Sequence, residues 1–147
     1  MGYIENIRKL VGNTPLILAS AGVILNDDKG RVLLSYRTDT TDWGLPGGYM
    51  ELGETVQETA VRELQEEMGI DVKDLQLFNI FSGPDFYHTY PNGDKVYSVI
   101  VVYLSSQFGG KINVDHNEIN TYQFFDLHSL PTTMTKTTKK ILEAFIH

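Results

Sequence analysis

The sequence has no cysteine, which excludes a disulfide framework and thiolate metal sites. It also has no apolar run near the roughly 18 residues that a membrane helix needs. The N-terminal residues, MGYIENIRKLVG, lack the apolar core of a secretory signal peptide. We therefore expect a cytoplasmic protein that does not contact a membrane.

Basic residues are scarce: 12 Lys and Arg stand against 19 Asp and Glu, and the formal net charge is −7. Duplex nucleic acid is held by many Lys and Arg contacts to phosphates, so this composition argues against a duplex-binding protein. The charge is compatible with a small phosphorylated substrate, because bound cations can invert the local electrostatic field. Hydrophobic residues make up 41% of the 147 residues, which suits a single globular domain over 1–147.

Apolar patterns and turn residues predict a mixed order of helices and strands. A short helix at 3–11 precedes strands at 16–25 and 31–37, and a glycine-rich loop leads to a short strand near 48–51. A helix between Thr55 and Gly69 follows, then strands at 75–82, 96–108 and 121–126 and a terminal helix at 135–146. This order predicts the α/β (α+β) class, an α/β/α sandwich with a mixed β-sheet between helices.

The central helix has recognisable ends and one apolar side. Thr55 and Glu58 have the spacing of a capping box, and Gly69 suits a left-handed C-terminal stop. The residues predicted to face the core are Val56, Ala60, Val61, Leu64 and Met68. On a helical wheel this stripe lies about a quarter-turn from the acidic face, so the helix can pack on a core and present carboxylates to a neighbouring cleft.

Three acids of this helix, Glu63, Glu66 and Glu67, are spaced i, i+3 and i+4, which places them on one helix face. Like charges at this spacing repel one another by about a few tenths of a kcal/mol per i,i+4 pair. A divalent cation neutralises such a cluster, and Mg²⁺ prefers carboxylate and carbonyl oxygens. The spacing therefore predicts a metal-dependent enzyme.

The stretch 48–70, GYMELGETVQETAVRELQEEMGI, resembles the Nudix box. That pattern is a glycine, five residues, Glu, seven residues, Arg-Glu, an apolar residue, any residue, Glu-Glu, any residue, a glycine and an apolar residue. The fixed positions here are Gly48, Glu54, Arg62, Glu63, Leu64, Glu66, Glu67, Gly69 and Ile70. The preceding segments RVLLSYR and WGLPGG also look like this family, whereas the second half matches only in its layout.

The resemblance implies a MutT-like pyrophosphohydrolase that cleaves the pyrophosphate linkage of a nucleoside diphosphate derivative, with Mg²⁺ or in its place Mn²⁺. The candidate substrates are a nucleoside triphosphate, a dinucleoside polyphosphate and an ADP-ribose-type compound. Tyr87 lies 17 residues after Ile70 (87 − 70), which resembles dinucleoside polyphosphate hydrolases. Pro84 lies 14 after it (84 − 70), near the place typical of the ADP-ribose subgroup. The alternatives are an RNA 5′-end pyrophosphohydrolase and a non-catalytic nucleotide-sensing module.

The resemblance also implies roles for single residues. Glu66 and Glu67 correspond to the main metal ligands, and Glu63 to a ligand or to a group that activates the water. Gly47 or Gly48, of which Gly48 belongs to the motif, can offer a backbone carbonyl to the metal, because a residue without a Cβ allows close approach. Glu118, in the loop before a late strand, corresponds to a further metal-binding acid. The identity of the general base stays open among the glutamates.

Arg62 completes the expected catalytic set with the three glutamates. Its spacing allows ion pairs with Glu66 at i+4 or Glu58 at i−4, and we expect it to orient the acids. Glu54 is expected to hold either the loop before the helix or this arginine.

Substrate binding is expected from the loops on either side of the box. Arg37 can contact a phosphate or form a surface ion pair, and Trp43 can stack on a base or pack within its loop. Phe86, Tyr87 and Tyr90 can line a base pocket or pack in the core. The expected partner is a small nucleotide, and a second copy of the chain, as a homodimer, also stays open.

Overall fold

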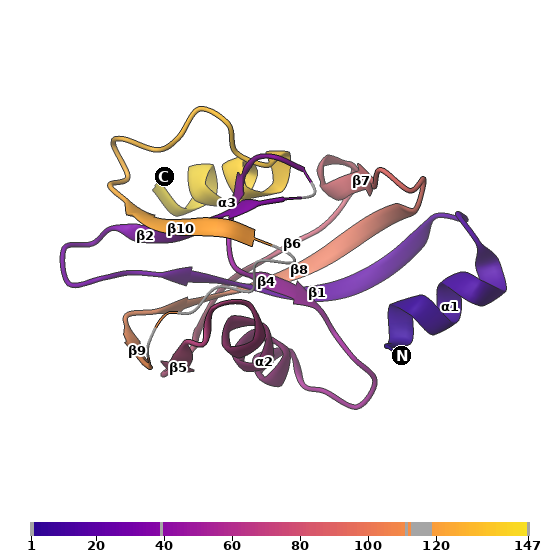
Figure 1. Cartoon of the computed structure of the whole chain (residues 1–147), viewed down its shortest axis with the longest axis horizontal. Helices are drawn as coiled ribbons and strands as arrows, with labels where there is room; N and C mark the ends of the chain where they lie inside the picture. The colour runs from indigo at the N-terminus through magenta and orange to yellow at the C-terminus, as the bar shows by residue number, and fades with distance from the viewer. Residues whose placement is uncertain (1, 39, 111, 113–118, 147) are drawn as a thin grey trace.

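The computed structural model describes residues 2–38, 40–110, 112 and 119–146. The elements follow one another along the chain (Figure 1) as α1 (Tyr3–Val11), β1 (Leu16–Leu25), β2 (Val32–Arg37), β3 (Trp43–Gly44), β4 (Gly47–Tyr49), α2 (Val56–Met68), β5 (Asp71–Lys73), β6 (Gln76–Phe81), the 3-10 helix η1 (Pro84–Phe86), β7 (Tyr87–Thr89), β8 (Lys95–Ser105), β9 (Gln107–Gly109), β10 (Ile119–Phe125) and α3 (Lys136–Ile146). Among the described helices, none has the length and apolar character needed to span a membrane.

The main sheet has the strand order β4-β1-β8-β6, and β7 pairs with β8 beside it. β1 and β8 run parallel over their whole length, from the pair Leu16–Val96 to the pair Leu25–Ser105. The pairings of β4, β6 and β7 are antiparallel, so the sheet is mixed. A second sheet has the order β10-β2-β3, and β5 pairs with β9.

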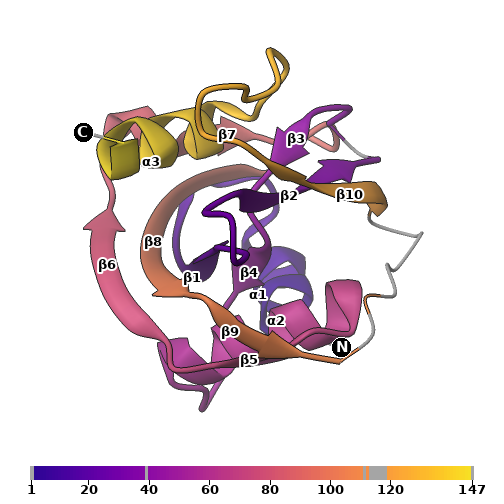
Figure 2. The same ribbon diagram turned by 90° about the vertical axis from the view of Figure 1, so that its left-hand side faces the viewer.

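Helices cover the strands on two opposite sides, with α2 on one side and α3 on the other (Figures 1 and 2). Alternate residues of β1 point to different cores. Val23 and Leu25 pack with Leu64 of α2, whereas Ile24 packs with Ile141 of α3. The predicted α/β/α sandwich with a mixed sheet is therefore confirmed.

The ends of α2 follow the predicted local signals. The Thr55 side chain accepts a hydrogen bond from the Glu58 backbone N–H, and the Glu58 side chain accepts one from the Thr55 backbone N–H. Gly69 ends the helix at φ 67° and ψ 22°, a left-handed conformation that glycine adopts without a Cβ penalty. One position of the predicted stripe was wrong: Val61 is 42% exposed, because it lies on the solvent side of the buried Ala60.

The predicted strand 96–108 is divided in the structure. β8 ends at Ser105, whose hydroxyl donates a hydrogen bond to the Lys73 carbonyl oxygen and accepts one from the Gln107 N–H. This contact redirects the chain into β9, which pairs with β5. The short strands β3, β5 and β7 were not predicted, because two or three residues carry no readable periodicity.

The capping box gives a test of the fold. Replacing Thr55 by alanine removes the side-chain acceptor for the Glu58 N–H, so we expect about 1 kcal/mol less free energy of unfolding. Urea denaturation followed by circular dichroism measures this loss. Thr132→Ala, at an exposed position in the segment before α3, is the matched control and is expected to change stability by less than about 0.5 kcal/mol. Equal effects of the two substitutions would contradict the capping role.

Candidate active site and metal centre

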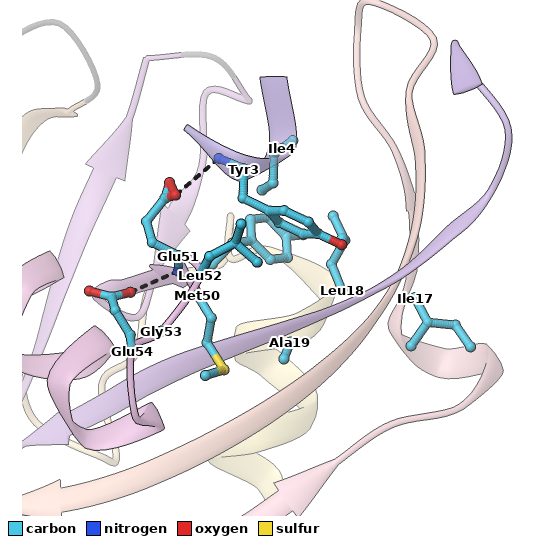
Figure 3. Close-up of a pocket in the computed structure, with 11 residues that line it drawn as sticks. Tyr3, Ile4, Ile17, Leu18, Ala19, Met50, Glu51, Leu52, Gly53 and Glu54 are labelled. Carbon is cyan, nitrogen blue, oxygen red and sulfur yellow. Dashed lines mark hydrogen bonds between the residues drawn. The ribbon is translucent and has the colours of Figure 1, made fainter. Parts of the chain in front are cut away.

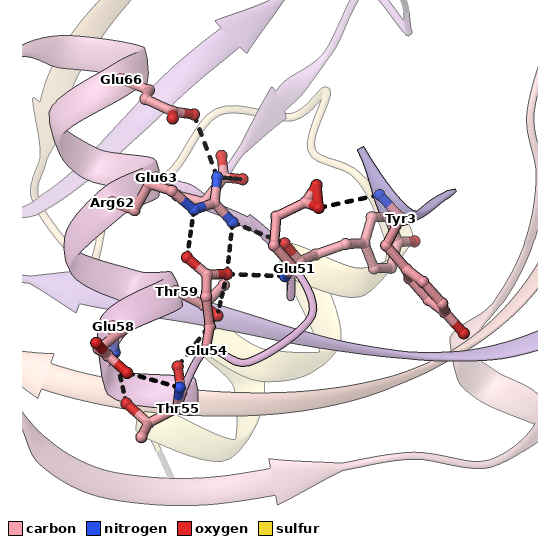
Figure 4. A network of polar contacts seen from close by, with 10 residues as sticks. Tyr3, Glu51, Glu54, Thr55, Glu58, Thr59, Arg62, Glu63 and Glu66 are labelled. Carbon is pink, nitrogen blue, oxygen red and sulfur yellow. Dashed lines mark hydrogen bonds and ion pairs between the residues drawn. The ribbon is translucent and has the colours of Figure 1, made fainter. Parts of the chain in front are cut away.

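The Arg62 guanidinium joins the three parts of the motif, as Figure 4 shows. Its Nε and Nη2 donate to the two carboxylate oxygens of Glu54 at 2.6 and 2.9 Å, a bidentate pair. Its Nη1 donates to Glu63 at 3.0 Å and to Glu66 at 3.2 Å. Nη2 also donates to the Tyr49 carbonyl oxygen at 3.0 Å. One side chain of α2 thereby fixes the preceding loop, the end of β4 and two acids of its own helix.

Glu54 is the principal partner of Arg62, in agreement with the prediction that it holds this arginine. Its carboxylate also accepts hydrogen bonds from the Thr59 hydroxyl at 3.0 Å and the Glu51 backbone N–H at 2.8 Å. The hydrogen bonds from Arg62 lower the pKa of Glu54 to about 2. The alternative pairing of Arg62 with Glu58 was wrong, because the Glu58 carboxylate caps the helix at Thr55.

The acids Glu63 and Glu67 meet at the inner side of α2. Glu67 is only 2% exposed, and Glu63 is hydrogen-bonded to it. Burial raises the pKa of Glu63, an effect partly offset by Glu67 and Arg62. Two carboxylates in contact away from water need a shared proton or a cation between them. Glu66 differs, since its side chain is 61% exposed.

Gly48 lies so close to the Glu63 carboxylate that a larger residue at this position would require the Glu63 side chain to move. A Cβ at this position would lie 2.5 Å from Glu63 Oε1. Buried carboxylate oxygens beside an accessible stretch of backbone are the donor chemistry of a hard divalent cation. Glu63, Glu67 and Gly48 therefore fit such an ion in the kind of atoms they offer.

The acids are not already arranged around one point. Within the described residues, no group of three His, Cys, Asp or Glu side chains has the geometry of a metal site. Arg62 Nη1 instead bonds to both Glu63 and Glu66, and it supplies the positive charge there. Glu118, the further predicted metal ligand, lies outside the described residues.

A cleft opens beside these acids, between the sheet and the start of α3. Of the predicted substrate residues, Arg37 and Phe86 line it, as does Tyr90. Gly48 and Glu63 also line it, so the acidic corner faces the cleft. The remaining lining residues are Ile4, Ser20, Ala21, Gly22, Thr40, Gly44, Leu45, Pro46, Gly47, Tyr49, Glu51, His88, Ser98, Ile100, Thr135, Thr137, Thr138 and Ile141.

Two predicted substrate residues lie elsewhere. Trp43 packs edge-on against Tyr36 and Phe125, with ring centroids 5.4 and 4.9 Å away, so it belongs to the core beneath α3. Tyr87 does not line the cleft, and its ring lies 4.7 Å from that of Tyr97. In both cases the structure shows the packing alternative, because each aromatic ring finds partners within the protein.

Sequence reasoning missed the floor of the cleft. The floor consists of Ser20 and Gly22 of β1 and Ser98 of β8. They lie on the same face of the main sheet as Ile24, which packs in the core beneath α3. The one available signal was the run of four small residues, 19–22, within LILASAGVIL, which the overall apolar character of that strand concealed.

Comparison with known proteins now identifies the family. The family model described as "NUDIX domain" matches residues 17–145. This chain belongs to the Nudix family. Nudix hydrolases use divalent metal ions, which agrees with the donor chemistry of the Glu63–Glu67 corner.

Curated Nudix relatives differ in their named activities. The chain is 35% identical over 117 residues to an ADP-ribose pyrophosphatase of Methanocaldococcus jannaschii, covering 78% of this chain and 64% of that protein. It is 32% identical over 108 residues to the NAD-capped RNA hydrolase NudC of Vibrio atlanticus, covering 74% of this chain and 36% of that protein. The chain thus spans less than two thirds of the length of these relatives.

A solved structure agrees with the fold. The MutT NUDIX hydrolase from Burkholderia pseudomallei superimposes with a TM-score of 0.75 at 30% identity. The match covers 87% of this chain and 97% of that one. The Nudix sandwich therefore extends over nearly the whole of a related protein.

The low pKa of Glu54 predicts a pH-dependent contribution to stability. Its carboxylate is ionised in the folded state down to about pH 2, whereas its ordinary pKa is 4.5. The contribution is therefore fully present above the ordinary pKa and is lost as pH falls towards 2. We expect Glu54→Gln to lower the free energy of unfolding by about 1.5–3 kcal/mol at neutral pH, and by progressively less at pH 4 and pH 3.

Urea denaturation across this pH range measures the effect. Glu143→Gln, at an exposed position of α3, removes the same charge away from the Arg62 network and is the matched control. A Glu54→Gln deficit that stays constant from pH 7 to pH 3 would contradict the assignment.

Proposed function

We propose that this chain is a metal-dependent hydrolase of the pyrophosphate linkage in a small nucleoside diphosphate derivative, with Mg²⁺ as the cofactor and Mn²⁺ as a substitute. The observation that carries the proposal is the corner of Gly48, Glu63 and Glu67, which opens into a cleft lined by Arg37. Membership of the Nudix family and the complete box support it. We also propose that residues 1–147 form one domain.

In this proposal Glu63, Glu66, Glu67 and the carbonyl group of Gly48 hold the ion, with Glu118 as an additional ligand. When bound, the ion neutralises phosphate charge and lowers the pKa of a coordinated water. Among the three helix acids, Glu63 is the one that lines the cleft, so it is either a ligand of the ion or the group that accepts a proton from the attacking water.

Arg62 and Arg37 have separate tasks in this proposal. Arg62 keeps Glu63 and Glu66 in position through Nη1, while Glu54 fixes the other edge of its guanidinium. Arg37 lines the cleft and offers a guanidinium to a substrate phosphate.

The substrate candidates are an ADP-ribose-type compound, a dinucleoside polyphosphate and a nucleoside triphosphate. The relative named ADP-ribose pyrophosphatase supports the first. The relative named NAD-capped RNA hydrolase supports an RNA 5′-end substrate as the second function. The net charge of −7 opposes long contacts to RNA phosphates, so we favour the free nucleotide.

A panel of substrates decides between these functions. Turnover of free nucleotides and of NAD-capped and triphosphorylated RNA is compared with Mg²⁺ or Mn²⁺, and the products are identified by mass spectrometry. Faster cleavage of the RNA ends would overturn the preferred substrate. Absence of turnover with every compound and both metals would instead favour the nucleotide-sensing module.

Replacing Glu67 by glutamine tests the metal site. The amide keeps the size of the buried side chain but removes its charge, so we expect kcat to fall by about a hundredfold or more while the far-ultraviolet circular dichroism spectrum stays unchanged. Glu143→Gln on α3 is the control for loss of a surface charge. Metal removal by EDTA is expected to abolish turnover of the wild type, and added Mg²⁺ to restore it. Wild-type kinetics in Glu67→Gln would contradict the site.

A further inference from the structure

Three hydroxyl groups form a hydrogen-bonded chain in the wall of the cleft. The Tyr49 hydroxyl lies 3.0 Å from the Ser98 hydroxyl and 2.9 Å from the Tyr90 hydroxyl. The three residues come from β4, β8 and the segment after β7, and all of them line the cleft. Glu63 lines the same cleft, so the hydroxyl chain and the acidic corner face one space.

The charge of the cleft limits what can bind beyond the acids. Among its described lining residues, Arg37 is the sole Lys or Arg, and Glu51 and Glu63 are acidic. A long polyphosphate needs several cationic contacts, which this wall does not provide. Hydroxyl groups are neutral, and each can both donate and accept a hydrogen bond. Such a wall suits a neutral group that also carries hydroxyls.

Arg8 of α1 fixes the segment that carries Tyr90. Its Nη2 donates to the Lys95 carbonyl oxygen at 2.7 Å, and its Nε lies 3.6 Å from the Asp94 carboxylate. The Asp94 carbonyl in turn accepts a hydrogen bond from the Tyr90 N–H at 2.8 Å. Arg8 therefore influences the position of Tyr90 through one residue, Asp94.

Helix α1 also closes the far end of the cleft. The Tyr3 N–H donates to the Glu51 carboxylate at 3.0 Å, and Ile4 lines the cleft itself. Figure 3 shows Tyr3 and Ile4 of α1 beside Glu51 and Leu52, in an adjoining pocket. This helix precedes the residues that match the Nudix model, which begin at 17. Residues outside the family-model match thus reach the wall of the cleft.

We propose that the hydroxyl chain of Tyr49, Tyr90 and Ser98 determines specificity for a neutral, hydroxyl-bearing group attached to the diphosphate, and that Arg8 of α1 is a positioning residue for it. This inference rests on the proposed hydrolysis and narrows its substrate. The three hydroxyls line the cleft and are hydrogen-bonded to one another, so we assign them to binding of the departing group and not to bond cleavage.

A matched pair of substrates tests the specificity. ADP-ribose and the β-methyl ester of ADP contain the same pyrophosphate bond, but only ADP-ribose has a second hydroxyl-bearing group. The wild type is expected to show the higher kcat/KM for ADP-ribose. Tyr90→Phe and Ser98→Ala each remove one hydroxyl and are expected to raise KM for ADP-ribose about tenfold with kcat unchanged. KM for the methyl ester is expected to change by less than twofold.

Tyr97→Phe is the matched control, because Tyr97 neighbours Ser98 on β8, does not line the cleft and is 41% exposed. It is expected to leave both KM values unchanged. Arg8→Ala is expected to reproduce the KM effect of Tyr90→Phe, and Arg8→Lys to restore part of it. Should Arg8→Ala fail to fold, Asp94→Asn weakens the same contact and carries the same expectation.

The outcomes separate this inference from the proposed function. The specificity role of the hydroxyl chain would be overturned if the wild type had equal kcat/KM for the two compounds. It would also be overturned if Tyr90→Phe lost equal kcat/KM with both. Either result would leave the proposed hydrolysis intact. A fall in kcat without a rise in KM in Arg8→Ala would overturn the positioning role. If neither compound is cleaved, the proposed hydrolysis is wrong, and the specificity is then tested by calorimetric titration of each compound. Tighter binding of ADP-ribose than of the methyl ester would support the inference. Equal binding of the two compounds, or no binding of either, would overturn it.

Discussion

The bidentate pair between Arg62 and Glu54 is the constraint on which the rest of the site depends. A guanidinium has five N–H donors in a rigid plane, so it can hold a loop acid, a strand carbonyl and helix acids at the same time. A lysine ammonium has three donors and no fixed plane, and it could not join these partners in one geometry. The relative placement of β4, the loop and α2 therefore follows from one residue.

This arrangement shifts the pKa values of Glu54 and Glu63 in opposite directions. The guanidinium lowers the pKa of Glu54 to about 2, so Glu54 keeps its charge and serves as an anchor. Burial raises the pKa of Glu63, so an added cation or proton would stabilise it there. The two acids of one motif thus differ in electrostatic environment because they have different neighbours.

The parts of the protein that are encoded locally could be predicted from the sequence. The limits of α2 follow from its capping box and Gly69, and the long strands β1, β2, β6 and β8 follow from their residue types; all are present, although β8 ends three residues before the predicted strand end. The sequence did not decide between a ligand pocket and packing for Trp43 and Tyr87, because an aromatic residue suits both equally well. The decision depends on partners such as Phe125 and Tyr97, which lie far away in the sequence or on another strand.

The cleft wall lies beyond the reach of local patterns for a related reason. Tyr49, Ser98 and Tyr90 become neighbours only because β4, β1 and β8 are adjacent in the sheet. One face of this sheet has large apolar residues under α3 and small or hydroxyl-bearing residues at the cleft. The apolar core therefore gives way to the cleft near Gly22 and Ser98. The chemistry of the family is thus held within one continuous motif. In our proposal the selection of substrate depends instead on separate strands and on α1, which precedes the residues matched by the family model.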